Sequence, residues 1–254
     1  TGNRTAKGDG TATSGLGAGM EVLGGTKLRF EGGLIAGNRT NGSGGGIYAR
    51  KDAVIVLDGT TVRGNHAAGG AGIFAAGAQV TAEGTTSIAG NQAGGDGGGV
   101  TVTGATGSVS LAASSVRVTG NTASNGAGIY AMSGTVVVAP GATVAENEAS
   151  STGGGIWAQG GDVLMDGTLR ANTAGSSGGG LYETNTDVTI LGGKVLANRA
   201  GQGGAGLRLS AVLGTTQSIT DATIRGNVAE QDGGGISLEH GALTLTGTIV
   251  EKNA

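Results

Sequence analysis

Cysteine is absent from this 254-residue chain, and proline occurs once. Without cysteine no disulfide can staple the fold, and the sequence says nothing about redox compartment. Charged residues make up only 13% of the chain and leave a net charge of −3, with the basic residues scattered, which argues against nucleic-acid binding. The residues contain neither a recognisable secretory signal nor an apolar run long enough to span a bilayer. We therefore expect no transmembrane segment in this chain.

Glycine, by contrast, accounts for 58 residues, and much of it lies in a recurring signature of two small residues followed by an apolar one. The copies are Gly45-Gly46-Ile47, Ala71-Gly72-Ile73, Gly98-Gly99-Val100, Ala127-Gly128-Ile129, Gly154-Gly155-Ile156, Gly179-Gly180-Leu181, Ala205-Gly206-Leu207 and Gly234-Gly235-Ile236, with Ala18-Gly19-Met20 as an earlier member. A second series is Asn38, Asn65, Asn91, Asn121, Asn147, Asn172, Asn198, Asn227 and Asn253, at intervals of 25 to 30 residues. A fixed period in this range indicates a solenoid of stacked units.

The two halves of each unit differ in how much their length varies. The distance from each asparagine to the next apolar residue of the glycine signature is always 8 or 9 residues. The return distance varies from 16 residues, between Ile156 and Asn172, to 21, between Val100 and Asn121. Because loops of a solenoid project from one face while the rest stays in register, we expect any recognition surface to lie on the variable side.

Short alternating, β-branched segments predict that each unit is built of strands. The residues expected to point inward are Ile55, Leu57, Val80, Ala82, Val109, Leu111, Val136, Val138, Val163, Met165, Val188, Ile190, Leu243 and Leu245. Two further short strands fit around this one, one beginning at the glycine signature and one ending at the asparagine. The prediction is an all-β, right-handed parallel β-helix, a single domain over residues 1–254 with about nine coils of about 26 residues and three short strands per coil.

The recurring asparagine predicts a structural ladder, in which side-chain amides at one corner of successive coils hydrogen-bond to each other. Two residues after each asparagine stands a small residue that should form a second inward row. These residues are Thr40, Ala67, Ala93, Ala123, Ala149, Ala174, Ala200 and Ala229. The corner is therefore interpreted as scaffold and not as a ligand site.

Neither end of the chain shows a capping segment. Thr1 to Thr5 looks like the asparagine corner of one more unit, and the sequence stops at the same corner, after Asn253. Open end coils present apolar surface and unpaired strand edges. Two hypotheses follow: the chain is part of a longer surface protein, or copies stack end to end into an extracellular fibre.

The paired signals Gly-Gly-apolar and apolar-x-x-Asn resemble the repeats of the chlamydial polymorphic outer-membrane proteins. The apolar residue stands three places before the asparagine at Ile35, Val62, Ile88, Val118, Val144, Leu169, Val195, Ile224 and Val250. In that family this residue is typically phenylalanine, and here it never is. The resemblance covers about Met20 to Asn253. It implies an autotransporter whose β-helical passenger is displayed on the bacterial surface and acts in adhesion.

Enzymes that resemble this architecture, such as pectate lyases and polygalacturonases, carry carboxylates with Arg, Lys or His on neighbouring coils. Here His66 and His240 occupy different places in the repeat, and Asp166 lies several coils from the equivalent Asp58 and Glu83. We therefore predict that the chain is not an enzyme, with no catalytic residues, metal site or cofactor. Ice binding is a further alternative, but the outward positions of the alternating strands are too mixed for a regular threonine array.

The residue that follows the apolar member of the glycine signature is often aromatic. Five of the six aromatics occupy this position: Tyr48, Phe74, Tyr130, Trp157 and Tyr182. Alternation turns the position outward, so the five are expected to form an exposed row that binds a glycan or a protein on a host cell. The alternative is that the rings only cover the glycine-rich turns. Glu183 directly follows Tyr182, so alternation assigns it to a core position. Because burying an unpaired carboxylate is costly, we expect a local bulge to turn Glu183 outward.

The sequence thus predicts a non-catalytic adhesin or passenger-type protein, extracellular or on a bacterial surface. Recognition would use the aromatic row and the loops of variable length. A fibre-forming structural subunit is the main alternative.

Overall fold

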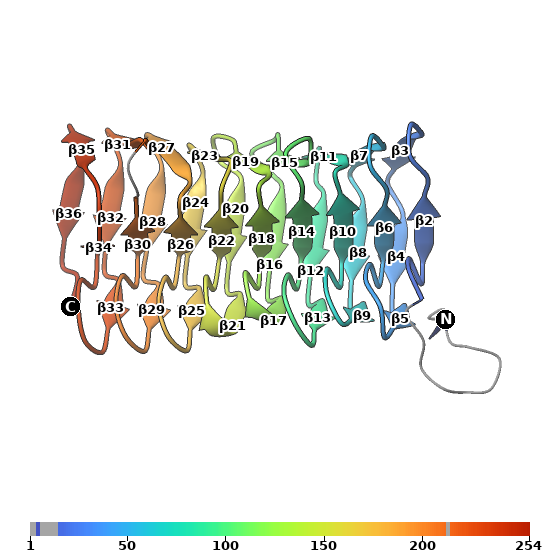
Figure 1. Cartoon of the computed structure of the whole chain (residues 1–254), viewed down its shortest axis with the longest axis horizontal. Helices are drawn as coiled ribbons and strands as arrows, with labels where there is room; N and C mark the ends of the chain where they lie inside the picture. The colour runs from blue at the N-terminus through green and yellow to red at the C-terminus, as the bar shows by residue number, and fades with distance from the viewer. Residues whose placement is uncertain (1–3, 6–14, 212–213) are drawn as a thin grey trace.

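The computed structural model describes residues 4–5, 15–211 and 214–254, which form 36 β-strands in four parallel sheets (Figure 1). Each sheet has nine strands, and the chain visits the sheets in turn, so that strands four apart in sequence are neighbours in space. The parallel β-helix of about nine coils is therefore confirmed. No helix in the described part of the chain is long and apolar enough to cross a membrane.

Two of the sheets flank the asparagine-to-glycine half of the repeat. Sheet A consists of β1 (Arg4–Thr5), β5 (Arg39–Thr40), β9 (His66–Ala67), β13 (Gln92–Ala93), β17 (Thr122–Asn125), β21 (Glu148–Thr152), β25 (Thr173–Ala174), β29 (Arg199–Ala200) and β33 (Val228–Ala229). Sheet B consists of β2 (Met20–Val22), β6 (Ile47–Ala49), β10 (Ile73–Ala76), β14 (Val100–Thr103), β18 (Ile129–Met132), β22 (Ile156–Gln159), β26 (Leu181–Thr184), β30 (Leu207–Ser210) and β34 (Ile236–Leu238).

The other two sheets form the half of the repeat that varies in length. Sheet C consists of β3 (Lys27–Glu31), β7 (Val54–Asp58), β11 (Gln79–Glu83), β15 (Ser108–Leu111), β19 (Thr135–Val138), β23 (Asp162–Met165), β27 (Asp187–Leu191), β31 (Gln217–Thr220) and β35 (Leu243–Thr246). Sheet D consists of β4 (Leu34–Ala36), β8 (Thr61–Arg63), β12 (Ser87–Ala89), β16 (Arg117–Thr119), β20 (Thr143–Ala145), β24 (Thr168–Arg170), β28 (Lys194–Leu196), β32 (Thr223–Arg225) and β36 (Ile249–Glu251).

The coil therefore has four strands where the sequence predicted three. Sheets B, C and D are the expected strands, and sheet A is the additional one. Most of its strands are two residues long, too short for the period-two alternation by which a strand is read from sequence. At the N-terminus, Arg4 and Thr5 pair with β5 as the expected additional unit requires. The corner asparagine expected there, Asn3, lies outside the described residues.

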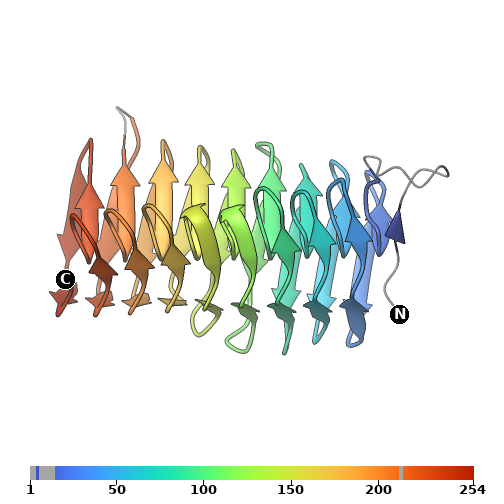
Figure 2. The same ribbon diagram turned by 90° about the horizontal axis from the view of Figure 1, so that it is seen from below.

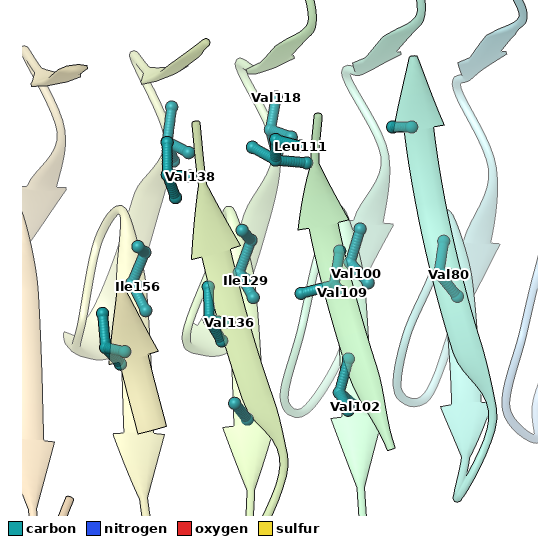
Figure 3. Packing of buried hydrophobic residues seen from close by; sticks show 14 of the residues in the cluster. Val80, Val100, Val102, Val109, Leu111, Val118, Ile129, Val136, Val138 and Ile156 are labelled. Carbon is teal, nitrogen blue, oxygen red and sulfur yellow. The ribbon is translucent and has the colours of Figure 1, made fainter. Parts of the chain in front are cut away.

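The core is a set of aliphatic rows that run along the axis (Figure 3). Adjacent coils pair in register, so that Ile47, Ile73 and Val100 stack on successive strands of sheet B. The residues predicted to point inward on sheet C are buried, except Leu243 and Leu245 of β35. These two lie in the last strand of the sheet, where no further described coil covers them.

The asparagines form the predicted ladder. The Asn121 amide is typical: its Nδ2 donates to Asn147 Oδ1 at 2.9 Å and to the Ile88 carbonyl at 3.0 Å. Its own Oδ1 accepts hydrogen bonds from the backbone N and from Nδ2 of Asn91, both at 2.9 Å. Asn121 is fully buried, and these bonds use both amide protons and the oxygen. The ladder is therefore a satisfied polar row inside the molecule.

The glycine signature is explained by the same corner. A Cβ placed on Gly46 would lie 2.5 Å from the carbonyl oxygen of Gly72 on the next coil and 3.1 Å from the ladder amide of Asn65. Only glycine leaves room for this approach, and every copy of the signature has glycine at this middle position. The small row predicted beside the ladder is also present, since Ala67, Ala93 and the equivalent residues of most later coils are buried.

The turns on either side of sheet C account for the variation in coil length. Between sheets B and C the turn has two residues at 160–161 and six at 211–216, of which 212–213 lie outside the described residues. Between sheets C and D it has two residues at 32–33 and five at 112–116. In Figure 1 sheet A lies along the bottom and loops of differing size project along the top. Figure 2 views the molecule from below, from the side that carries sheet A.

Candidate functional site

The five aromatic residues occupy one outward row on sheet B. Tyr48 pairs with Phe74, and Tyr130 and Trp157 and then Tyr182 follow in register on β18, β22 and β26. Thr101 interrupts the row on β14, and Arg208 continues it on β30. Alternation along each strand puts these side chains outside because the residues before and after them are in the core.

The rings stack on each other. The centroids of Tyr48 and Phe74 are 5.3 Å apart, with the ring planes 15° from parallel. Tyr130 and Trp157 are 4.3 Å apart at 4°, and Trp157 and Tyr182 are 6.4 Å apart at 8°. Parallel in-register strands produce this stacking, because their spacing of about 4.8 Å is close to the preferred separation of offset rings.

The aromatic row is less exposed than the sequence predicted. Tyr130 is buried, with 6% of its surface exposed, and the other four rings are half-buried. Trp157 lies between Tyr130 and Tyr182, so both of its faces turn toward neighbouring rings, whereas each of the other four rings has a ring on one face only. The binding role of the row stays a prediction.

Tyr130 holds the second stack against the neighbouring turn. Burial, together with the nearby negative charge of Asp96, raises the pKa of the Tyr130 hydroxyl to about 12. Asp96 is itself fixed by the side chain of Asn125, whose Nδ2 donates to Asp96 Oδ1 at 2.9 Å. Tyr130 packs closely against a glycine of the preceding turn, since a Cβ placed on Gly126 would lie 2.8 Å from the Tyr130 Cβ. The row therefore also covers the glycine-rich turns, as the alternative interpretation predicted.

Cations lie at both ends of the row. The guanidinium carbon of Arg50 is 5.8 Å from the centroid of the Tyr48 ring, within cation–π range. At the other end Arg208 donates to the Ser237 hydroxyl at 2.7 Å and pairs with Glu239 at 2.9 Å. Each end of the row thus carries an arginine that is ion-paired with a carboxylate, Arg50 with Glu21 and Arg208 with Glu239.

Glu183 lies in the core, so the prediction that a bulge turns it outward is wrong. It pairs in register with Ala158 and Leu209 and is fully buried. Its carboxylate accepts hydrogen bonds from the backbone N–H groups of Thr186 at 3.2 Å and Ser210 at 2.8 Å. Burial raises the pKa of this carboxyl, and the two backbone donors oppose the rise only in part. The strand keeps its register because the backbone donors satisfy the carboxylate in place.

A second buried polar residue shares this part of the core. Gln217 donates from Nε2 to the Thr186 carbonyl at 2.8 Å, and it is 2% exposed. Among the described residues its Oε1 has no hydrogen-bond partner. Glu183 thus accepts from the backbone N–H of Thr186, and Gln217 donates to its carbonyl. Both side chains hold the backbone just before β27 from inside the β-helix.

The acidic turn residues lie where the sequence indicated, with Asp58 and Glu83 together and Asp166 apart. Arg29 binds three carboxylates on successive coils, those of Glu31, Asp58 and Glu83, at 2.6 to 2.7 Å. Asp166 lies on a distant coil and is not part of this group. The carboxylates raise the pKa of the Arg29 guanidinium, foremost through the hydrogen bond to Glu31. The group is an exposed ion-pair network that joins three successive coils.

No other described residues assemble into a recognisable reaction centre or metal site. His66 lies in β9 of sheet A, whereas His240 lies in the turn after β34 of sheet B, at the far end of the molecule. Among residues 15–211 and 214–254 no group of three or more His, Asp or Glu side chains is placed to hold a metal ion. That the chain is not an enzyme stays a prediction.

A family model described as the right-handed beta helix region matches residues 107–254, which is more than half of the chain. The chain belongs to the right-handed beta helix family. The predicted hand and repeat class are therefore confirmed. No curated protein and no solved structure gives a significant match. The specific resemblance of this β-helix to the chlamydial polymorphic repeats stays a prediction.

Two features of this β-helix were not predicted from the sequence. One is the pair of backbone donors, Thr186 and Ser210, that accommodate Glu183 in the core. The other is a polar groove on sheet A lined by Arg39, His66 and Gln92, which all follow a ladder asparagine directly. Aligning the repeats at the residue after the asparagine would have placed these three side chains on neighbouring strands.

Proposed function

We propose that this right-handed β-helix is a non-catalytic adhesin or passenger-type protein that acts outside the cell, secreted or on a bacterial surface. In this proposal the stacked coils form a rod, and the aromatic row with the adjoining turns contacts a glycan or a protein on a host cell. The observation that carries the proposal is the row itself: five of six aromatics lie in one outward, in-register line, half-buried for the most part and flanked by Arg50 and Arg208.

Aromatic residues in such a row supply contact area with little loss of side-chain freedom, and their polar tips supply direction. Stacking fixes the rings before a partner arrives, so binding does not have to order them. The resemblance to the chlamydial polymorphic outer-membrane proteins supports the same function, because adhesion is what that resemblance implies. The repeat signals themselves are explained by the coil corner, so they support the architecture more than the activity.

A glycan array tests the proposal with three proteins: the unchanged chain, the double variant Trp157→Ala/Tyr182→Ala, and the control Leu164→Ala. Leu164 is an exposed apolar residue of β23, on sheet C and outside the row. We expect the unchanged chain and the control to bind the same glycans, and the double variant to lose at least ten-fold in signal on the uncharged glycans of the array while its circular dichroism is unchanged. Equal binding by all three proteins, or binding by none to glycans or to cultured host cells, would count against the proposal.

A second candidate function is a structural subunit that stacks end to end. The last described coil exposes Leu245, Ile249 and Val250, and the first exposes Leu23 and Leu34. The strands run in the same direction throughout, so the final coil of one copy has the polarity needed to pair with the first coil of another. Sedimentation velocity decides: growth of rods with concentration, abolished by Ile249→Lys, is expected of a fibre subunit, and a concentration-independent monomer excludes it.

A further inference from the structure

The groove on sheet A lies apart from the aromatic row and is lined by polar side chains and by small apolar residues. It has a volume of about 320 Å³ and is lined along β5, β9 and β13. Sheet A runs along the bottom of Figure 1, whereas the row is on sheet B. Thr40, Ala67 and Ala93, the small residues beside the asparagine ladder, form its floor, because alternation turns them inward.

One wall of the groove is a line of three side chains on successive coils. Arg39 pairs in register with His66, and His66 with Gln92. Neighbouring strands are about 4.8 Å apart, so the line spans about 10 Å, the length of two sugar rings. On the opposite side the residues that follow the floor are Asn41, Ala68 and Gly94, and the small size of Ala68 and Gly94 leaves the hollow open there.

The side chains of the wall have no polar partner among the residues that the structure describes. No other described residue forms a side-chain hydrogen bond or ion pair with Arg39, His66 or Gln92. Most other arginines of the described chain are occupied, such as Arg29 with three carboxylates and Arg50 with Glu21. No acidic residue is among those that line the groove. The hollow therefore offers one full positive charge and several hydrogen-bonding groups to an outside ligand.

The chemistry of the wall defines the class of ligand. A guanidinium binds a carboxylate or a sulfate through paired N–H groups, whereas an imidazole and a primary amide match hydroxyl groups. The lining has no Phe, Tyr or Trp ring. The hollow is also shallow and open to solvent. We propose that this groove is a binding site for a short anionic saccharide, with Arg39 on the acidic group and His66 and Gln92 on sugar hydroxyls.

The groove and the aromatic row share no residues, so a negative binding result for one does not refute the proposal for the other. The test is an NMR titration of the whole chain in 150 mM salt, where diffuse attraction between surface charges is screened. The probes are a chondroitin sulfate tetrasaccharide, the neutral tetrasaccharide chitotetraose, and sodium sulfate. His66 reports on the groove, and His240 in the turn after β34 is an internal reference on the same spectrum.

We expect the sulfated tetrasaccharide to shift the His66 ring signals and leave those of His240 in place. Arg39→Gln should weaken binding about ten-fold, since it removes the charged partner and keeps a polar side chain. Arg199→Gln is the matched control, because Arg199 has the same place on β29 of sheet A but does not line the groove. Trp157→Ala/Tyr182→Ala should bind the tetrasaccharide as the unchanged chain does.

Three results overturn the assignment. Unshifted His66 signals would show that the groove binds no such ligand. Equal affinity for chitotetraose or for sodium sulfate alone would show that the groove does not select a saccharide bearing an acidic group. An equal loss in Arg39→Gln and Arg199→Gln would show general attraction to positive charge and no defined site.

Discussion

Glu183 occupies a place in the core that alanine or leucine fills on the adjacent strands. An ionised carboxylate there would lose its hydration, which two backbone N–H groups replace only in part. Folding therefore shifts the equilibrium of Glu183 toward its protonated form, consistent with the raised pKa. A single polar residue thus ties the stability of the middle coils to pH.

The sign of this dependence follows from the raised pKa. A carboxyl whose pKa is higher in the folded than in the unfolded chain contributes stability that is fully present below the unfolded value, near 4.5, and is lost as pH rises through the folded value. The free energy of unfolding of the unchanged chain, relative to Glu183→Gln, should fall as pH rises above about 4.5. Urea unfolding of both proteins at a series of pH values measures it. A constant difference would contradict a buried, titrating Glu183.

Gly64 shows what the backbone requires just before the asparagine corner. Its φ is +59°, in the left-handed region, and a Cβ placed there would meet nothing within 4 Å. Gly64→Ala should therefore destabilise the fold by about 1 kcal/mol through backbone conformation alone.

Gly94 is the matched control, since its φ lies outside the left-handed region and its added Cβ would be 4.0 Å from the nearest atom. Gly94→Ala should be neutral or stabilising by about 0.5 kcal/mol, because it restricts the unfolded chain. Thermal unfolding of both variants gives the comparison. Equal effects of the two substitutions would refute the conformational explanation.

At the scale of the element, the asparagine ladder joins each coil to the next. Asn121→Ala removes an oxygen that accepts from two donors of Asn91 and an amide that donates to Asn147 and to the Ile88 carbonyl. Several buried polar groups lose their partners, at about 1 to 3 kcal/mol each, so we expect a loss of roughly 3 kcal/mol or more. Asn41→Ala, an exposed asparagine outside the ladder, should change stability by less than about 0.5 kcal/mol. Denaturant unfolding measures both, and similar small losses would mean that the ladder is not structural.

The sequence predicted the ladder and the core rows because repetition displays them many times over. Each inward position recurs at one place in the unit, so Val80, Val109 and Val136 are recognised together. Sheet A was not predicted, because strands as short as β9 carry no alternation of their own. The pattern identified Glu183 as anomalous but could not show that Thr186 and Ser210 would satisfy it in the core.

The aromatic row shows the same limit. Alternation predicted that Trp157 points outward, but sequence spacing along one chain does not show how rings on neighbouring coils orient toward each other. Stacking at 4.3 Å with Tyr130 follows from the in-register pairing of β18 and β22. The groove at Arg39 depends in addition on the small size of Ala68 and Gly94, which an analysis of apolar and asparagine positions does not consider.

At the scale of the whole molecule, stability should vary along the axis, because each coil contacts only its neighbours. Interior coils have a partner on both sides, whereas β34 and β35 lack one on their far side within the described chain. We expect backbone amides of β14 and β18 to exchange with solvent slowest and those of β34 fastest. Hydrogen exchange followed by mass spectrometry tests this. Uniform protection from end to end would indicate all-or-none unfolding and contradict a nearest-neighbour stack.

The β-helix thus holds a ring stack on sheet B and a polar groove on sheet A in fixed positions along a rod. Fixed spacing lets several weak contacts act together on a repetitive or extended partner, which suits adhesion at a surface. The proposed adhesion depends on recognition through the outward row. Trp157 and Tyr182 of that row are half-buried and lie outside the core, so they are the residues to replace.

The most direct test is equilibrium binding of the fluorescently labelled chain to intact cultured host cells, for the unchanged chain and for Trp157→Ala/Tyr182→Ala. We predict saturable binding by the unchanged chain and at least a ten-fold loss of affinity in the double variant, with the fold retained in both. Saturable binding that the double variant keeps in full would contradict recognition through the row, and the absence of binding by the unchanged chain would contradict its role as an adhesin.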